Sequence, residues 1–325
     1  MLLQEVFLEI LFELEKIKFM NNIKVFCPAS VANVSCGFDV LGFCIGGIGD
    51  EILIKKTPNK GLSISRITGA KLSFDPKKNV ATIAASAILK KFNLNYGFDF
   101  EIRKKIKPGS GIGSSAASAS GAVFGINELI GNPYKRKELI KFALEGEKYA
   151  SKAEHADNIA PALLGGFTLV RSNKTLDIIK LPYPEMLYVT ILHPEIELKT
   201  AHARSILKKL IPLNDAVKQS GNLAALISAL YTNNYDLISR SLKDYIIEPY
   251  RSKLIPEFDL LKKTALDSGA LGSGISGSGP SIYALSKGKK TAENVGKEMK
   301  KIISKLPIKH KVYVSKINRK GVEII

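Results

Sequence analysis

A loop at residues 107–117 constrains this chain more than any other segment. It reads Lys-Pro-Gly-Ser-Gly-Ile-Gly-Ser-Ser-Ala-Ala, and apolar residues follow it at three- and four-residue spacing, which predicts a buried helix over 114–130. The small residues remove bulk where the helix begins, and the free N–H groups at a helix start attract anions. The segment therefore predicts an anion site, most simply for a triphosphate, although a solvent-exposed glycine–serine turn has the same composition.

The spacing of this loop differs from two common nucleotide motifs. Gly-x-x-x-x-Gly-Lys-Ser/Thr is absent, and Gly109, Gly111 and Gly113 alternate, so the loop is not Gly-x-Gly-x-x-Gly either. Two more small-residue segments lie before and after it in the chain. We interpret 28–42 as a loop that carries Asn33 and Asp39, and 274–281 as a hairpin-like loop before a strand at 282–285.

Three glycine-rich segments in this order resemble the signature motifs of the GHMP kinases, a superfamily of small-molecule kinases. Other segments are similar to motifs of the homoserine kinases within it: Gly-Phe-Asp-Val-Leu-Gly at 37–42, His-Ala-Asp-Asn-Ile-Ala-Pro at 155–161 and Glu-Pro-Tyr-Arg-Ser-Lys-Leu-Ile-Pro at 248–256. Val31 departs from the first motif, where a serine is more usual. The resemblance runs from about residue 24 to the end of the chain, and several motifs in order are more specific than one.

The resemblance implies an α+β, two-domain GHMP kinase fold. A ribosomal-protein-like ATP-binding domain would span 21–183 and a ferredoxin-like domain 184–325. The residues themselves agree, because the expected strands and helices do not alternate as a doubly wound parallel sheet requires. Two prolines in 181–185 break both kinds of element and mark the boundary. Strands are expected at 23–26, 50–56, 62–67, 98–106, 166–171, 177–181, 187–193, 282–285 and 312–317, and helices at 79–92, 114–130, 135–153, 214–231, 255–268 and 291–304.

Residues 1–20 differ from the rest of the chain. They lack the basic leader and cleavage site of a signal peptide and the roughly 20 uninterrupted apolar residues of a membrane span. We interpret them either as the result of a mis-assigned start, which we favour, or as an amphipathic helix that packs on the body of the protein or on a partner. The apolar residues at helical spacing are Leu2, Leu3, Val6, Phe7, Ile10, Leu11 and Leu14, beside Glu5, Glu9, Glu13 and Glu15.

The formal net charge of +18 arises from 48 basic and 30 acidic residues. Basic pairs are scattered along the whole chain and are not clustered among aromatics, so we expect a solvated surface with no nucleic-acid or membrane partner. The chain has three cysteines, Cys27, Cys36 and Cys44, and their odd number and spacing match neither a disulfide framework nor a zinc site. Buried reduced thiols and a cytoplasmic location are expected. We also expect a homodimer.

ATP and Mg²⁺ are the cofactors that the resemblance implies. Mg²⁺ takes oxygen ligands and needs only one or two from a protein, which the resemblance assigns to Ser115 and Glu147. From spacing alone, an exposed carboxylate paired with Lys148 or Lys152 is the first interpretation of Glu147, and the resemblance reverses that order. The residues implied in nucleotide binding are Lys107, Pro108, Gly109, Ser110, Gly111, Ile112, Gly113, Ser114, Ser115, Ala116 and Ala117 of the loop, together with Asn79.

A homoserine pocket needs a carboxylate for the amine and cations for the carboxyl group. Arginine suits the second task because its planar fork matches a carboxylate with two hydrogen bonds. Each implied residue also has an ordinary interpretation, as a turn residue, a surface charge or a structural imidazole. The resemblance assigns the amine to Asp39, the carboxyl group to Arg204 and Arg251, and the hydroxyl end to Asn33, His155 and Asn158.

The proton acceptor is where this chain departs from mevalonate-kinase-like relatives. Those proteins place an aspartate eleven residues after the metal glutamate, and here that position is Asn158, whose amide cannot act as a base. The departure fits homoserine kinases, which act by positioning, with Asn33, Asp39, Asn158 and Thr200 as implied catalytic residues. The resemblance implies ATP-dependent phosphorylation of the L-homoserine hydroxyl, on the route to threonine. A mevalonate- or shikimate-type kinase and a catalytically silent metabolite sensor stay open as alternatives.

Overall fold

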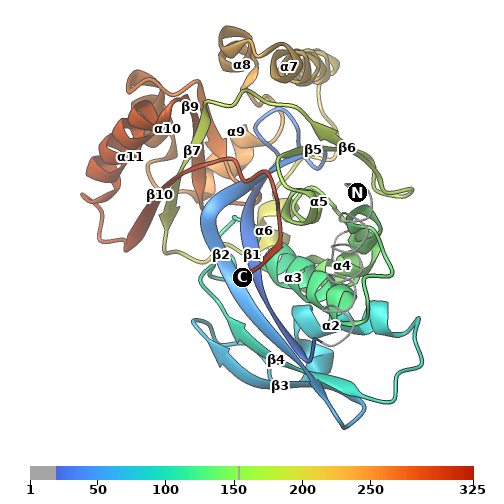
Figure 1. Ribbon diagram of the computed structural model, residues 1–325. Helices are drawn as coiled ribbons and strands as arrows, with labels where there is room; N and C mark the ends of the chain where they lie inside the picture. The colour runs from blue at the N-terminus through green and yellow to red at the C-terminus, as the bar shows by residue number, and fades with distance from the viewer. Residues whose placement is uncertain (1–19, 153) are drawn as a thin grey trace, which may run out of the picture.

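The computed structural model describes residues 20–152 and 154–325 (Figure 1). The segment interpreted above as an extension or a mis-assigned start lies outside the described residues except for Met20. Two sheets, each covered by helices, account for most of the described chain.

The first sheet has seven strands in the order β11-β1-β2-β4-β3, with β5 pairing with β2 and β6 with β5. Every pair is antiparallel except β3 with β4. Because β11 pairs with β1, the last strand of the chain lies in the same sheet as the first strand. The strands are β1 (Asn22–Ala32), β2 (Leu41–Thr57), β3 (Gly61–Thr68), β4 (Gly97–Arg103), β5 (Phe167–Ser172), β6 (Asp177–Leu181) and β11 (Glu323–Ile324).

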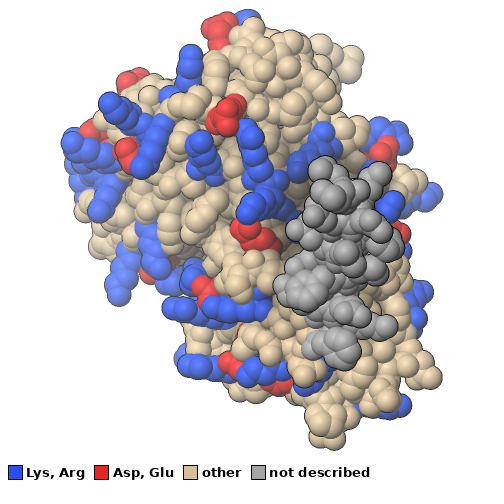
Figure 2. All heavy atoms as spheres, in the orientation of Figure 1, with Lys and Arg blue, Asp and Glu red and all other residues tan. Residues whose placement is uncertain are grey.

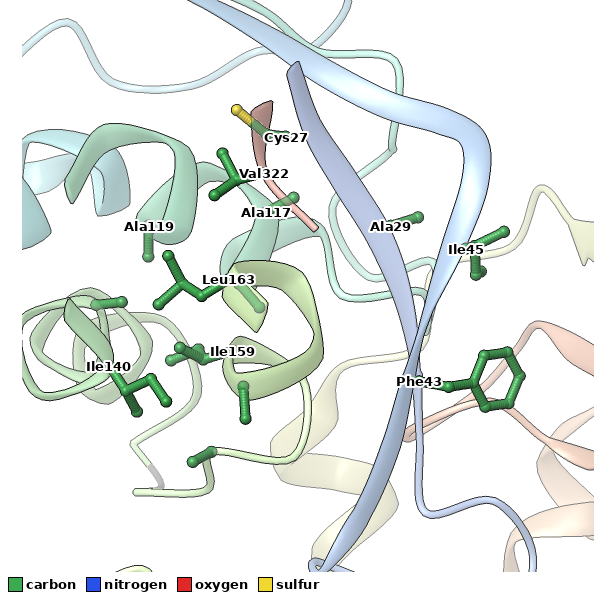
Figure 3. Packing of buried hydrophobic residues seen from close by; sticks show 14 of the residues in the cluster. Cys27, Ala29, Phe43, Ile45, Ala117, Ala119, Ile140, Ile159, Leu163 and Val322 are labelled. Atoms are coloured by element: carbon green, nitrogen blue, oxygen red, sulfur yellow. The ribbon is translucent and has the colours of Figure 1, made fainter. Parts of the chain in front are cut away.

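Helices cover one face of this sheet, and small residues bring α3 close to it. A Cβ on Gly121 would lie 1.9 Å from Cys27 Sγ, and one on Gly125 would lie 2.6 Å from Ile54 Cδ1. Figure 3 shows Ala117 and Ala119 gathered with α5 residues on one side of β1. The composition of the predicted buried helix is thus explained by its close approach to β1 and β2. The helical elements are η1 (Pro76–Lys78), α2 (Val80–Leu89), α3 (Ser114–Leu129), α4 (Arg136–Ser151) and α5 (Ile159–Leu164).

The second sheet has four antiparallel strands in the order β10-β7-β9-β8. Numbered along the chain this order is 4-1-3-2, which is the ferredoxin-like arrangement, so the predicted α+β class is confirmed. Helices α10 and α11 pack on this sheet. The elements are β7 (Leu187–Pro194), α6 (Thr200–Ser205), α7 (Leu213–Thr232), α8 (Tyr235–Ser241), α9 (Glu248–Arg251), η2 (Ser252–Leu254), α10 (Phe258–Asp267), β8 (Gly272–Ile275), β9 (Ile282–Lys287), α11 (Lys289–Ile303) and β10 (His310–Lys316).

The largest difference from the sequence prediction concerns residues 28–49. We expected a loop over 28–42, but β1 continues to Ala32 and β2 begins at Leu41, so that only 33–40 form the loop. Glycine suggested a loop here because it weakens strand propensity. At Gly42 the glycine has another purpose, since a Cβ would lie 1.8 Å from the Asp157 carbonyl oxygen. The short elements α5, α6, α8, α9, β8 and β11 were also missed, and β8 includes the first two residues of the loop expected over 274–281.

The described surface agrees with the composition. Figure 2 shows lysine and arginine side chains spread over both domains on the face in view. Among the described residues, no helix is both long and apolar enough to cross a membrane. All three cysteines are buried and unpaired, as predicted.

Candidate active site

The anion loop connects the residues after β4 to the start of α3, and both of its ends are held. Ser114 Oγ donates to the Ile106 carbonyl at 2.9 Å, closing the loop at its base. Gly109, Gly111 and Gly113 all have positive φ, at 72°, 80° and 70°. These left-handed residues turn the chain just before α3. The N–H groups of the first turn of α3 have no preceding turn to bond to, and Gly113 provides no side-chain cap for them.

A buried ion pair between Lys104 and Asp50 also holds this loop in place. Lys104 Nζ contacts Asp50 and donates to the Ser114 carbonyl at 3.0 Å and to Ser118 Oγ at 2.9 Å. The other Asp50 oxygen accepts from the backbone N–H groups of Lys105 and Ile106 at 2.7 and 2.9 Å. The pair therefore ties β2 and the entry to the loop to the first turn of α3.

The middle of the anion loop packs against the glycine-rich loop of the second domain. Ser276 Oγ donates to the Gly111 carbonyl at 2.7 Å, and Ser281 Oγ donates to the Ser110 carbonyl at 2.6 Å. A Cβ on Gly111 would lie 2.5 Å from the Gly279 carbonyl oxygen. This glycine is thus required by contact between two loops, in addition to any room for phosphates.

Other loop residues also have structural partners. Lys107 Nζ pairs with Glu195 at 2.8 Å, and Ile112 is buried in the core. Asn79 caps α2, since its Oδ1 accepts from Ala81 N at 3.1 Å while its Nδ2 donates to the Ser73 carbonyl. The described residues provide no partner for the buried Ser110 Oγ. A nucleotide role for these residues stays a prediction.

Ser115 and Glu147, expected to hold the metal, are brought together by α3 and α4. Ser115 Oγ donates to Glu147 Oε2 at 2.7 Å. Burial of the carboxyl group raises the pKa of Glu147, which marks a carboxylate short of positive charge. Lys148 pairs instead with Glu145 and Glu154. The surface pair with Lys148 considered above is therefore absent.

The residues fit Mg²⁺ by the chemistry of their donors. A hydroxyl and a carboxylate are hard oxygen ligands, and Mg²⁺ often takes only one or two of these from a protein. Over residues 20–152 and 154–325 no group of three or more His, Cys, Asp or Glu side chains forms a metal cage.

A small pocket of about 60 Å³ opens beside Glu147, between the two domains. Its walls come from the loop after β1, from α4 and the segment that follows it, from α6 and from the 276–281 loop. The lining residues are Ala32, Asn33, Asp39, Glu147, Ser151, His155, Asp157, Asn158, Thr200, Arg204, Arg251, Gly277 and Ser278.

Asp39 and Arg204, which the sequence assigned to opposite ends of a substrate, pair with each other. Arg204 Nη2 lies 2.8 Å from Asp39 Oδ1, and Nη1 lies 3.1 Å from Oδ2. His155 Nε2 approaches the same carboxylate at 3.6 Å. Arg204 Nε and His155 Nδ1 are buried without partners among the described residues. The pocket therefore carries an anion and a cation side by side, together with an unused donor at Arg204 Nε and an unpaired ring nitrogen at His155 Nδ1.

Asn33 and Arg251 hold the backbone around the Asp39–Arg204 pair in place. Asn33 Nδ2 donates to the Gly277 carbonyl at 2.8 Å, and its Oδ1 accepts from Asp39 N at 3.0 Å. Arg251 is 2% exposed and donates to the Ala203 and Gly277 carbonyls at 3.0 Å each. Burial, followed by the Arg204 charge, lowers the pKa of Arg251 to about 10, so it stays charged at neutral pH. Its Nη2 is not used by these bonds and can meet a ligand.

Asn158 and Thr200 complete the reacting end of the pocket. Ser30 Oγ donates to Asn158 Oδ1 at 2.8 Å, which leaves the Asn158 amide N–H groups as donors toward a ligand. Thr200 Oγ1 lies 3.3 Å from Ser278 Oγ, where α6 meets the second glycine-rich loop. Both candidate residues therefore line one pocket with Glu147.

Asp157 is the main pocket residue that the sequence analysis missed. It is 5% exposed, and burial, followed by the nearby Asp39 and Glu147 charges, raises its pKa to about 7. The spacing of eleven residues from Glu147 points to position 158, which is Asn158, and no spacing signal points to residue 157. Ser151 and Ser278 were missed as well, because single serines carry no spacing signal.

Comparison with known proteins connects this geometry to a family. The model for the GHMP kinases N terminal domain matches residues 79–166, and the model for the GHMP kinases C terminal matches 226–305. A homoserine kinase of Chlorobium phaeobacteroides is 44% identical, over 94% of this chain and 100% of that protein. The chain belongs to the homoserine kinase family. A homoserine kinase of Methanococcus maripaludis is 38% identical over 86% of this chain and 93% of that protein.

Solved structures agree with this family assignment. The crystal structure of a homoserine kinase from Cytophaga hutchinsonii has a TM-score of 0.92 and 50% identity, covering 94% of this chain and 98% of that one. The L. major mevalonate kinase in complex with R-mevalonate has a TM-score of 0.71 at 17% identity, covering 92% and 98%. The second likeness shows the GHMP kinase fold alone. The predicted fold and family of this homoserine kinase homologue are confirmed.

Proposed function

We propose that this protein transfers the γ-phosphate of ATP to the hydroxyl of L-homoserine, giving O-phospho-L-homoserine and ADP on the route to threonine. The observation that carries the proposal is the Asp39–Arg204 pair in the pocket that Glu147 also lines. A zwitterionic amino acid offers an ammonium to the first and a carboxylate to the second. The family membership supports the same substrate.

The phosphates of ATP would lie on the N–H groups at the start of α3, where the positive end of the helix dipole favours them. Mg²⁺, when bound, neutralises charge on the transferred phosphate, and Ser115 and Glu147 would hold it. The Lys104–Asp50 pair fixes the position of the helix start that carries Ser115. Catalysis then depends mainly on positioning.

At the acceptor end, the Asn158 amide N–H groups would orient the homoserine hydroxyl by donating to its oxygen. An amide cannot take the hydroxyl proton, so that proton must leave to the phosphate or to another acceptor. Arg251 would donate from Nη2 to the carboxylate of the bound homoserine, beside Arg204. We place the reaction in the cytoplasm, where buried thiols such as these stay reduced. A homodimer remains a prediction.

One assay separates this proposal from the alternatives. ADP release is measured with homoserine, mevalonate and shikimate in turn, with the Glu147→Gln variant alongside. We expect turnover with homoserine alone, and a much lower kcat in the variant with little change in homoserine affinity. Preference for another acceptor would establish a different kinase, and absence of turnover with all three would favour a silent sensor.

A further inference from the structure

A groove of about 1050 Å³ lies on the first domain, apart from the active site. It runs between the start of β3 and β4 and the helices α2 and α4, and it shares no lining residue with the pocket described above. Apolar side chains form much of its lining, among them Leu62, Ile83, Ala87, Phe92, Tyr96 and Phe142. An apolar hollow of this size marks a surface that something covers.

The charged side chains around the groove are mostly basic. Five lysines line it, against two acidic residues, Asp75 and Glu145. We call the apolar side chains the floor of the groove and the lysines its rim. An occupant with an apolar face and acidic flanks would complement both. The lysines are Lys60, Lys77, Lys90, Lys91 and Lys141.

The described chain begins beside this groove. Met20 packs against the core, and Asn22 at the start of β1 pairs with Lys55, which in turn pairs with Asp99 of β4. Two strand spacings, about 10 Å, therefore separate the beginning of β1 from the strand that carries Phe98 on the groove lining.

The nineteen residues before Met20 have the chemistry that this groove requires. They contain four glutamates, all within 1–15, against two lysines, Lys16 and Lys18, and their apolar residues recur at helical spacing. A helix of this length spans about 28 Å, enough to cover the groove from its entry point. We propose that residues 1–19 dock in this groove as an amphipathic helix, with the apolar stripe on the floor and the glutamates toward the lysines. Of the two interpretations of residues 1–20 above, the groove supports the packed helix.

Hydrogen exchange tests the proposal on the full chain and on a chain that starts at Met20. Removing the segment uncovers the groove, so amides within 83–98 should lose protection by about tenfold or more, while those of α11 should not change. A synthetic peptide of residues 1–19 should restore the protection. The same peptide with its four glutamates changed to lysine should not, because it repels the rim.

A substitution inside the groove provides a second measurement on the intact chain. Ala87→Glu places a charge on the floor and should expose the amides of residues 2–14 to exchange, whereas Ala224→Glu, at an exposed position on α7, should not. Equal protection of 83–98 in the full and shortened chains would overturn the proposal. So would protection in the full chain that rises with protein concentration, because it would identify a second copy as the occupant.

Discussion

At the scale of single residues, the Asp39–Arg204 pair links the sequence to the proposed chemistry. Each residue was assigned to a different end of homoserine, and in the structure each neutralises the other at 2.8 and 3.1 Å. An amino acid can replace both halves of this pair at once, while a substrate with only a carboxylate would leave Asp39 without its partner. The pair thus favours zwitterions over mevalonate or shikimate.

Replacing Arg204 tests this assignment. Arg204→Leu should weaken homoserine binding by about 2 kcal/mol, roughly thirtyfold, with ATP affinity nearly unchanged, and Arg204→Lys should recover only part because an ammonium lacks the planar fork. Arg240→Leu is the matched control, since Arg240 pairs with Asp236 on the exposed surface. Steady-state kinetics with each substrate varied would measure both affinities. Equal weakening of ATP and homoserine would remove Arg204 from the substrate site.

The buried Asp157 predicts a pH dependence of stability. Its pKa rises from the usual 3.8 to about 7, so between about pH 4 and 7 the folded protein keeps a proton that the unfolded chain releases. Stability from this group is therefore full below pH 4 and is lost as the pH rises to 7. Asp157→Asn should be more stable than the parent at pH 8 by up to about 4 kcal/mol, with little difference at pH 4. Urea unfolding at both pH values measures this, and a constant difference across the range would contradict it.

At the scale of elements, the anion loop depends on glycine for two reasons. Its glycines turn the chain with positive φ, and Gly111 also leaves room for the second domain's loop. The sequence suggested room for phosphate, whereas the structure adds a contact between protein loops. A side chain at Gly111 therefore acts first on the alignment of the two domains.

The two reasons can be separated with matched glycines. Gly111 has a φ of +80°, and a Cβ at this position would lie 2.5 Å from the Gly279 carbonyl oxygen. Gly47 has a similar φ of +69°, but a Cβ there would have no atom within 4 Å. We expect Gly47→Ala to lose only the 1–2 kcal/mol or so of a left-handed alanine. Gly111→Ala should lose more stability and weaken ATP binding at least about tenfold. Calorimetry and nucleotide titration measure the two effects, and identical losses in both variants would leave backbone strain as the whole cause.

At the scale of the whole molecule, the end of the chain completes the first domain. β11 pairs with β1, and Val322 N donates to the Ala162 carbonyl at 2.7 Å. The Val322 side chain is fully buried and lies near Cys27 and Ala117 in Figure 3. The first domain therefore requires residues that follow the whole second domain in the sequence, and the two domains should unfold together.

Shortening one buried side chain near the end of the chain tests this coupling. Val322→Ala should lower the free energy of unfolding by about 2 kcal/mol, whereas Ile325→Ala, at a residue 55% exposed, should change it little. Denaturant unfolding followed by probes in each domain would report both values. If only the second domain responds to Val322→Ala, the proposed role of the chain end in the first domain is wrong.

The family, the α+β class and most of the longer elements could be predicted from the sequence, which also named most of the residues that line the pocket. These depend on local signals, namely hydrophobic period, glycine spacing and motif order. Tertiary structure decided what no local pattern contains. It extended β1 to Ala32, it carried β2 through glycines such as Gly42 that other segments approach closely, and it gave β11 a partner about 300 residues away. It also paired Asp39 with Arg204 and raised the pKa of Asp157, because burial and neighbouring charge depend on which distant segments meet.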